Sequence, residues 1–142
     1  SQIVVQNSKL CGYKPTSALK LWATDAYRPT NGLWNQGRAV TIGVGGGCDR
    51  ITFKKTLFHW FNVAFYNAAA SNTLLEDCVF ADQIIDNIKT DGQNINFTMR
   101  RTILYRIWSV REASGAIAHN DNCQNTTKTQ PGWKDHTIEN CS

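Results

Sequence analysis

Residues 72–80 read NTLLEDCVF, and residues 96–104, 24 positions further along the chain, read NFTMRRTIL. Both stretches begin with asparagine, alternate like a β-strand, then carry a small residue and end on a bulky apolar one. The same pattern recurs at residues 3–10 (IVVQNSKL), 51–58 (ITFKKTLF) and 136–142 (HTIENCS). Repetition of one strand-and-bend unit predicts a solenoid, because a short strand buries its apolar face only against the next copy.

Two positions of the unit define columns that run along such a solenoid. The third strand residue is apolar in every copy, and a serine, threonine or cysteine follows at the bend. An apolar residue then closes each of the first four copies. The inward column consists of Val5, Phe53, Leu75, Met99 and Ile138, the bend column of Ser8, Thr56, Cys78, Thr102 and Cys141, and the closing residues are Leu10, Phe58, Phe80 and Leu104.

The spacing of the copies predicts the architecture. Successive third positions lie 48, 22, 24 and 39 residues apart, which indicates one turn of 22 to 24 residues enlarged twice by loops. Connections between parallel strands are almost always right-handed. We therefore predict an all-β chain, a right-handed parallel β-helix of about five turns. It forms one domain over residues 1–142, with loop insertions at residues 24–38 and 125–134.

Strands are expected at the first and the last residues, with no helix or polar cap at either end. We therefore expect the sequence to be a segment of a longer coil, or to pack end-on against other chains.

Composition excludes several classes of protein. With 42% hydrophobic and 18% charged residues the chain is globular, and no stretch approaches the roughly 20 apolar residues of a membrane span. A net charge of +4 is modest for a nucleic-acid domain. The five cysteines fit no zinc spacing. We interpret Cys78 and Cys141 as stacked bend residues rather than as disulfide partners or reactive thiols.

The stretches NTLLEDCVF, NFTMRRTIL and DHTIENCS (residues 135–142) resemble the repeat N-V-T-I-x-N-C-x-F of the pectin-lyase-like right-handed β-helix superfamily. The resemblance extends over nearly the whole chain. Similar proteins include polysaccharide lyases, polygalacturonase-like hydrolases, phage tailspikes and non-catalytic surface proteins. The resemblance implies a polysaccharide partner and an extracellular, secreted or virion-surface location.

A second strand signal follows in each turn, at residues 39–44 (or 18–23), 62–66, 87–91 and 116–121. A register in which Ala64, Ile88 and Ala118 point inward produces two outward columns. In it, Asp91 and Asp121 lie about 5 Å apart at the backbone, and charges this close shift one another's pKa. The columns are Phe65, Lys89 and His119, and then Asn67, Asp91 and Asp121.

Two chemistries fit this arrangement. In β-elimination from an acidic sugar, Lys89 or His119 is the base. The positive charges of Arg100, Arg101 or Arg106 then neutralise the developing negative charge. In glycoside hydrolysis, Asp91 and Asp121 share the acid and base roles. The alternative is a purely structural role, in which both aspartates are hydrogen-bonded corner residues and take no part in catalysis.

Two short motifs add to the resemblance. KTDG (residues 89–92) is similar to the NTDG motif of polygalacturonase-like hydrolases, and NDNC (residues 120–123) to their aspartate pair, with Asn122 in place of the second aspartate. Nothing matches that family's later histidine or Arg-x-Lys motifs. HNDNCQ (residues 119–124) resembles an H-x-D-x-x-Q string of other β-helix proteins and adds Gln124 to the candidate contacts.

Further binding residues come from the insertions. Trp22 and Trp34 lie in or beside the first one, where indole rings can stack on sugar faces. No cofactor motif is present. Asp82, Asp86 and Asp91 offer oxygen ligands of the kind that calcium prefers, although their spacing matches no known calcium-binding loop.

The sequence thus predicts an extracellular or virion-surface protein that binds an acidic polysaccharide and, if catalytic, cleaves it as a lyase or hydrolase. The alternative is a non-catalytic structural or adhesive solenoid that forms a rod or a filament component.

Overall fold

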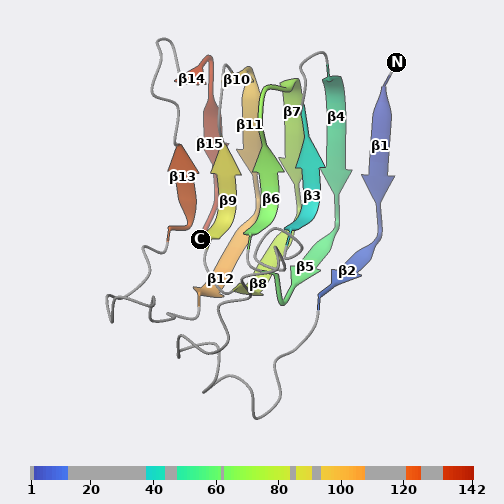
Figure 1. The fold of residues 1–142 in the computed structure, drawn as a ribbon, viewed down its shortest axis with the longest axis vertical. Helices are drawn as coiled ribbons and strands as arrows, with labels where there is room; N and C mark the ends of the chain where they lie inside the picture. The colour runs from blue at the N-terminus through green and yellow to red at the C-terminus, as the bar shows by residue number, and fades with distance from the viewer. Residues whose placement is uncertain are drawn as a thin grey trace, which may run out of the picture.

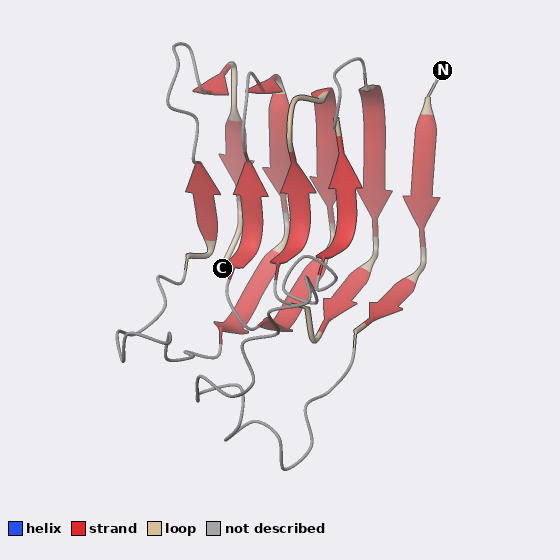
Figure 2. Cartoon of the chain, viewed as in Figure 1, coloured by secondary structure: helices blue, strands red, loops and turns tan. Residues whose placement is uncertain are grey.

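The computed structural model of the chain describes residues 2–12, 38–43, 48–61, 63–83, 86–90, 94–107, 121–125 and 133–142. Every regular element in these ranges is a β-strand, and every strand pairing is parallel (Figure 2). Across these residues the chain has no helix of the length and apolar character needed to cross a membrane.

Sheet A is the five-stranded sheet, with the strand order β1-β4-β7-β11-β15. Its register joins Val5 to Phe53, Phe53 to Leu75, Leu75 to Met99, and Met99 to Ile138, so the predicted column is confirmed. Its three middle members are buried, whereas Ile138 on the last strand is 51% exposed. The strands are β1 (Ile3–Gln6), β4 (Asp49–Lys54), β7 (Ser71–Glu76), β11 (Phe97–Arg100) and β15 (Thr137–Glu139).

Sheet B has four strands in the order β12-β8-β5-β2. Its register places Leu10, Phe58, Phe80 and Leu104 side by side, which confirms that the closing residues of the repeat form a column. The rings of Phe58 and Phe80 stack with centroids 4.4 Å apart and planes 2° apart. The strands are β2 (Lys9–Cys11), β5 (Leu57–His59), β8 (Val79–Gln83) and β12 (Ile103–Ile107).

A two-residue bend follows each strand of sheet A, and the first four of these bends lead into a strand of sheet B. Its first residue is left-handed, with φ between 48° and 53°, a conformation that asparagine and aspartate adopt most readily among residues with a side chain. Its second residue is the predicted small one, whose hydroxyl or thiol donates a hydrogen bond to the carbonyl two residues earlier. The left-handed residues are Asn7, Lys55, Asp77, Arg101 and Asn140, and the donors are Ser8, Thr56, Cys78, Thr102 and Cys141.

The bend cysteines therefore act as short hydrogen-bonding side chains. All five cysteines of the protein are free thiols, which agrees with the interpretation of Cys78 and Cys141 as stacked bend residues.

Sheet C also has four strands, in the order β13-β9-β6-β3. They are β3 (Arg38–Ile42), β6 (Val63–Asn67), β9 (Asp86–Thr90) and β13 (Cys123–Asn125). A further two-stranded sheet pairs β10 (Asn94–Ile95) with β14 (Trp133–Lys134).

The chain visits sheets A, B and C in turn four times and returns to sheet A with β15 (Figure 1). The sheets therefore stack corresponding strands of successive turns, an arrangement consistent with a parallel β-helix. The core lies between the three sheets and is largely aromatic and aliphatic. Its buried members include Phe53, Phe58, Phe65, Leu75, Phe80, Ile88, Phe97 and Met99.

Candidate functional site

The predicted register of sheet C is wrong by one residue at β6. Phe65 pairs with Ile88, Tyr66 with Lys89 and Asn67 with Thr90. Because side chains alternate between the two faces of a strand, a one-residue shift moves Phe65 from the surface to the interior. Its side chain is fully buried, and its ring lies edge-on to Phe53 with a centroid distance of 5.5 Å. Phe65 is a core residue and does not contact ligand.

Asn67 also lies inside the fold rather than on the predicted outward column. Its Oδ1 accepts a hydrogen bond from the Ala70 backbone N at 2.7 Å, and its Nδ2 donates to the Ala70 carbonyl at 3.4 Å. Asn67 is fully buried, and it satisfies the backbone of the corner that leads from β6 to β7.

The register at β13 differs further from the prediction. Cys123 pairs with Ile88 and Gln124 with Lys89, an offset of 35 residues where 30 was expected. Asp121 consequently lies beside Asp86, whose Oδ1 accepts a hydrogen bond from the Asp121 backbone N at 3.0 Å. Asp121 is therefore not at the level that the prediction gave it. Asp91, His119, Trp22 and Trp34 lie outside the described residues.

The register instead assembles a different outward column, which we call the sheet C strip. Tyr66 and Lys89 are neighbours on β6 and β9, and both are half-buried while the residues on either side of them are buried. Thr41 of β3 and Gln124 of β13 continue the column on either side. Of the predicted contact residues, Lys89 and Gln124 are thus brought together. The strip consists of Thr41, Tyr66, Lys89 and Gln124.

The strip carries positive charge without a compensating carboxylate. The Arg38 guanidinium carbon lies 3.9 Å from the centroid of the Tyr66 ring, in cation–π geometry. In the part of the chain that the structure describes, neither Arg38 nor Lys89 forms an ion pair. Two cations therefore flank one aromatic ring. Tyr66 was missed in the sequence because the register was assigned one residue away. Arg38 was missed because the prediction placed it in the loop insertion at residues 24–38, whereas it is the first residue of β3.

The arginines predicted to contact substrate behave differently, because each binds a carboxylate of the preceding turn. Arg100 Nε donates to Glu76 Oε1 at 2.7 Å, and Arg101 Nε donates to Asp77 Oδ1 at 2.6 Å. Each partner lies 24 residues earlier, which is one repeat. The acidic residues 76–82 and the basic residues 100–106 therefore form an ion-pair ladder on neighbouring strands.

Glu76 is the centre of this ladder. Its side chain is 7% exposed, Lys54 Nζ lies 2.8 Å from its Oε2, and Arg101 also binds its Oε1. The hydrogen bond from Lys54, followed by that from Arg101, lowers the pKa of Glu76 to about 2. Glu76 is therefore an ionised structural group.

The ladder continues on sheet B with the ion pairs of Asp82. Asp82 accepts from Arg106 through Oδ1 and lies 3.0 Å from His59 Nε2 through Oδ2. Its carboxylate is therefore engaged by side chains of the fold rather than directed towards a calcium ion. Within the described ranges, no three His, Cys, Asp or Glu side chains are arranged to hold a metal ion.

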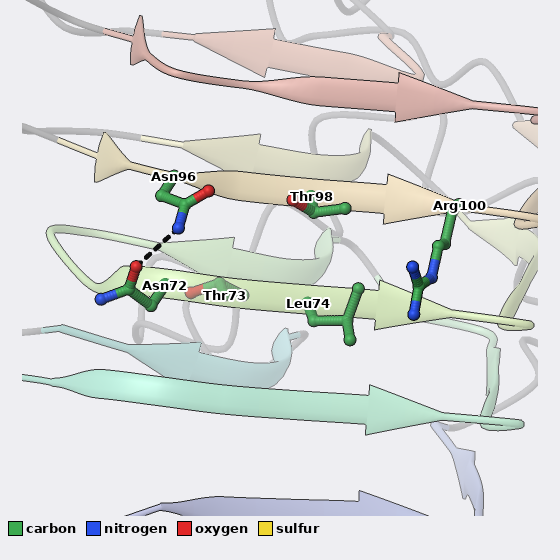
Figure 3. Close-up of a pocket in the computed structure, with 6 residues that line it drawn as sticks. All are labelled: Asn72, Thr73, Leu74, Asn96, Thr98 and Arg100. Atoms are coloured by element: carbon green, nitrogen blue, oxygen red, sulfur yellow. Dashed lines mark hydrogen bonds between the residues drawn. The ribbon is translucent and has the colours of Figure 1, made fainter.

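One surface hollow of about 230 Å³ lies on the outer face of sheet A, across β7 and β11 (Figure 3). Of the residues that line it, only Arg100 was predicted from the sequence as a binding residue. The lining consists of Asn72, Thr73, Leu74, Asn96, Thr98 and Arg100.

Comparison of the chain with protein-family models, with curated proteins and with solved structures gives no significant match. The site must therefore be interpreted from its own chemistry.

Proposed function

We propose that this chain is a right-handed parallel β-helix of the pectin-lyase-like type that binds an acidic polysaccharide along the sheet C strip, in an extracellular or virion-surface setting. The observation that supports the proposal most directly is the pair of cations, Arg38 and Lys89, beside Tyr66. Neither has a carboxylate partner among the described residues. An anionic ligand supplies the missing charge.

The strip matches an extended polymer in its dimensions and chemistry. A polysaccharide that crosses the strands meets one side chain about every 4.8 Å. Lys89 and Arg38 bind sugar carboxylates, with Arg38 held flat by the Tyr66 ring. Thr41, which is exposed, offers a hydroxyl group to the sugar hydroxyls.

Binding is better supported than cleavage. Both predicted mechanisms assign roles to residues outside the described ranges, Asp91 and His119. Asp121, the remaining carboxylate, uses its backbone to join Asp86 and Asn87 at a corner. The proposed role is therefore recognition of the polymer, and cleavage is kept as a measured outcome.

The test measures affinity for polygalacturonate in a Lys89→Gln variant at low salt. We expect binding about tenfold weaker, the effect of losing one charge-assisted contact. Lys55→Gln is the matched control, because Lys55 is an exposed lysine at the bend between sheets A and B and forms no ion pair with any other described residue.

Equal losses in the two variants, or equal affinity for a neutral polysaccharide, would overturn the proposal. Incubation of the polymer with the protein, followed by assays for unsaturated uronates and new reducing ends, reports cleavage separately.

A second candidate function is a non-catalytic structural or adhesive solenoid. It is favoured by the continuous ladders that run along the stack, namely the ion pairs of Glu76 and Asp77 and the repeated bend hydrogen bonds. Such ladders stiffen a rod without requiring a ligand. A folded protein that binds no acidic polymer would support this candidate over the first.

A further inference from the structure

We propose that the hollow on sheet A is a second subsite, which accepts a single uronic acid unit, a hydroxylated ring that carries one carboxylate. The inference rests on the ligand class proposed for the sheet C strip, but it concerns another wall of the molecule and other residues. The hollow, at about 230 Å³, is smaller than the roughly 300–1,000 Å³ typical of pockets for drug-sized ligands. It therefore fits one sugar ring rather than a longer segment.

One end of the hollow presents an oriented hydrogen-bond acceptor. The carboxylate of Asp49 only accepts, so Asn72 must place its Nδ2 towards it, at 2.6 Å from Oδ1. Asn72 Oδ1 in turn accepts from Asn96 Nδ2 at 2.7 Å. This ladder fixes the orientation of both amides. With Asn96 Nδ2 bound to Asn72, the side-chain oxygen of Asn96, Oδ1, points along β11 towards Thr98 (Figure 3).

The backbone supports this orientation. Asn72 and Asn96 are both left-handed, with φ of 51° and 56°, and they occupy the same position in successive turns. Their amides therefore start from equivalent backbone positions, and the ladder repeats from one turn to the next.

The other end of the hollow presents a cation. Two nitrogens of Arg100, Nε and one terminal nitrogen, each lie 2.7 Å from Glu76 Oε1. A guanidinium has five N–H groups, so three remain for a ligand. Arg100 is therefore the group at the hollow that binds the single carboxylate of the ligand.

The floor between the two ends is mixed in character. Thr98 and Leu74 are neighbours in register on β11 and β7, both at outward positions. Leu74 offers an aliphatic surface to the C–H groups of a sugar ring, and the Thr98 hydroxyl reaches a ring hydroxyl. The carboxylate of the sugar then lies on Arg100, and a second hydroxyl donates to Asn96 Oδ1.

The experiment is a titration of the ¹⁵N-labelled protein with galacturonate, followed by chemical-shift changes. We expect saturable shifts at Asn96, Thr98 and Arg100, with affinity at least about tenfold higher than for galactose, which lacks the carboxylate. Thr98→Asp places a negative charge on the floor and should abolish these shifts. Thr52→Asp, in the same outward column on β4 but outside the hollow, should retain them.

Three results would overturn the inference. They are equal affinity for galactose, equal loss in both aspartate variants, or galacturonate shifts confined to Tyr66, Lys89 and Gln124. The last result would leave the sheet C strip as the binding surface and exclude the hollow. If the affinity for polygalacturonate does not depend on Lys89, the strip is excluded instead. The galacturonate titration then decides the role of the hollow independently.

Discussion

Glu76 and Arg100 face one another across β7 and β11, with Glu76 Oε1 2.7 Å from Arg100 Nε, although 24 residues separate them in the sequence. The same one-turn relationship joins Asp77 to Arg101 and Asp82 to Arg106. The repeat length therefore decides which charges meet, and the arginines that follow the acidic stretch serve the fold before they can serve a ligand.

Acid should destabilise the protein through Glu76. Its pKa is about 2 in the folded protein and 4.5 for the ordinary group, so its stabilising contribution is complete above about pH 4.5 and is lost as the pH falls towards 2. Glu76→Gln should lower the unfolding free energy at pH 7 by about 1 to 3 kcal/mol. It should also flatten the pH dependence below pH 4.5. Urea unfolding from pH 2.5 to 7 measures both. An unchanged acid profile in the variant would contradict this role.

Arg101 and Lys89 should have opposite effects on stability and binding. Arg101→Gln removes contacts to Glu76 and Asp77 and should lower Tm while polygalacturonate affinity stays unchanged. Lys89→Gln should weaken polygalacturonate binding and leave Tm within the scatter of the wild type, because Lys89 forms no ion pair among the described residues. Calorimetry and binding assays on both variants check the pair. If Arg101→Gln instead weakened polygalacturonate binding and left Tm unchanged, Arg101 would be a ligand-binding residue rather than a structural one.

The thiols should differ widely in reactivity. Burial raises the pKa of Cys78, and burial likewise raises the pKa of Cys123 to about 11. Because the thiolate is the reactive form, neither should be alkylated in the native protein at pH 8, whereas the exposed Cys11 should be labelled first. Mass spectrometry after brief iodoacetamide treatment gives the order. Early labelling of Cys78 would show that the bend column opens readily.

Gly43 should not tolerate a side chain. Its φ is +76°, and a Cβ there would lie 2.6 Å from the backbone nitrogens of Ala69 and Ala70. Gly43→Ala should therefore cost more than about 1 kcal/mol of unfolding free energy. Thr41→Ala, two residues earlier and exposed, should change stability by less than about 0.5 kcal/mol. Denaturant unfolding distinguishes them, and equal stabilities would contradict the close approach.

Sheets A and B could be predicted from the sequence because the bend between them has a fixed length. One left-handed residue and one small residue always separate the two strands, as at Asp77 and Cys78. Once one turn is placed, the columns through Leu75 and Phe80 follow by counting. The ion-pair ladder between residues 76–82 and 100–106 could also be predicted from the sequence. The two stretches lie 24 residues apart, which is one repeat, so their charges meet on neighbouring strands.

Sheet C could not be predicted in the same way. The segments between its strands differ in length from turn to turn, so similar strings such as those around Asp91 and Asp121 do not have to occupy equivalent positions. A register error of one residue at β6 assigned Phe65 to the surface and Tyr66 to the interior. A register error of five residues at β13 aligned Asp121 with the wrong residue of β9. The candidate site lies on sheet C, the sheet whose register the sequence constrains least.

The sequence by itself determined that the chain is a stack of short parallel strands, because a regular repeat of alternating residues and small bend residues has few other ways to bury its apolar side chains. Only the tertiary structure decided which side chains share a surface. Register on sheet C depends on how Phe65 and Ile88 pack in the core. Charge depends on which cations the neighbouring turn has already neutralised. Both are properties of contacts between turns, and no single turn of the sequence contains them.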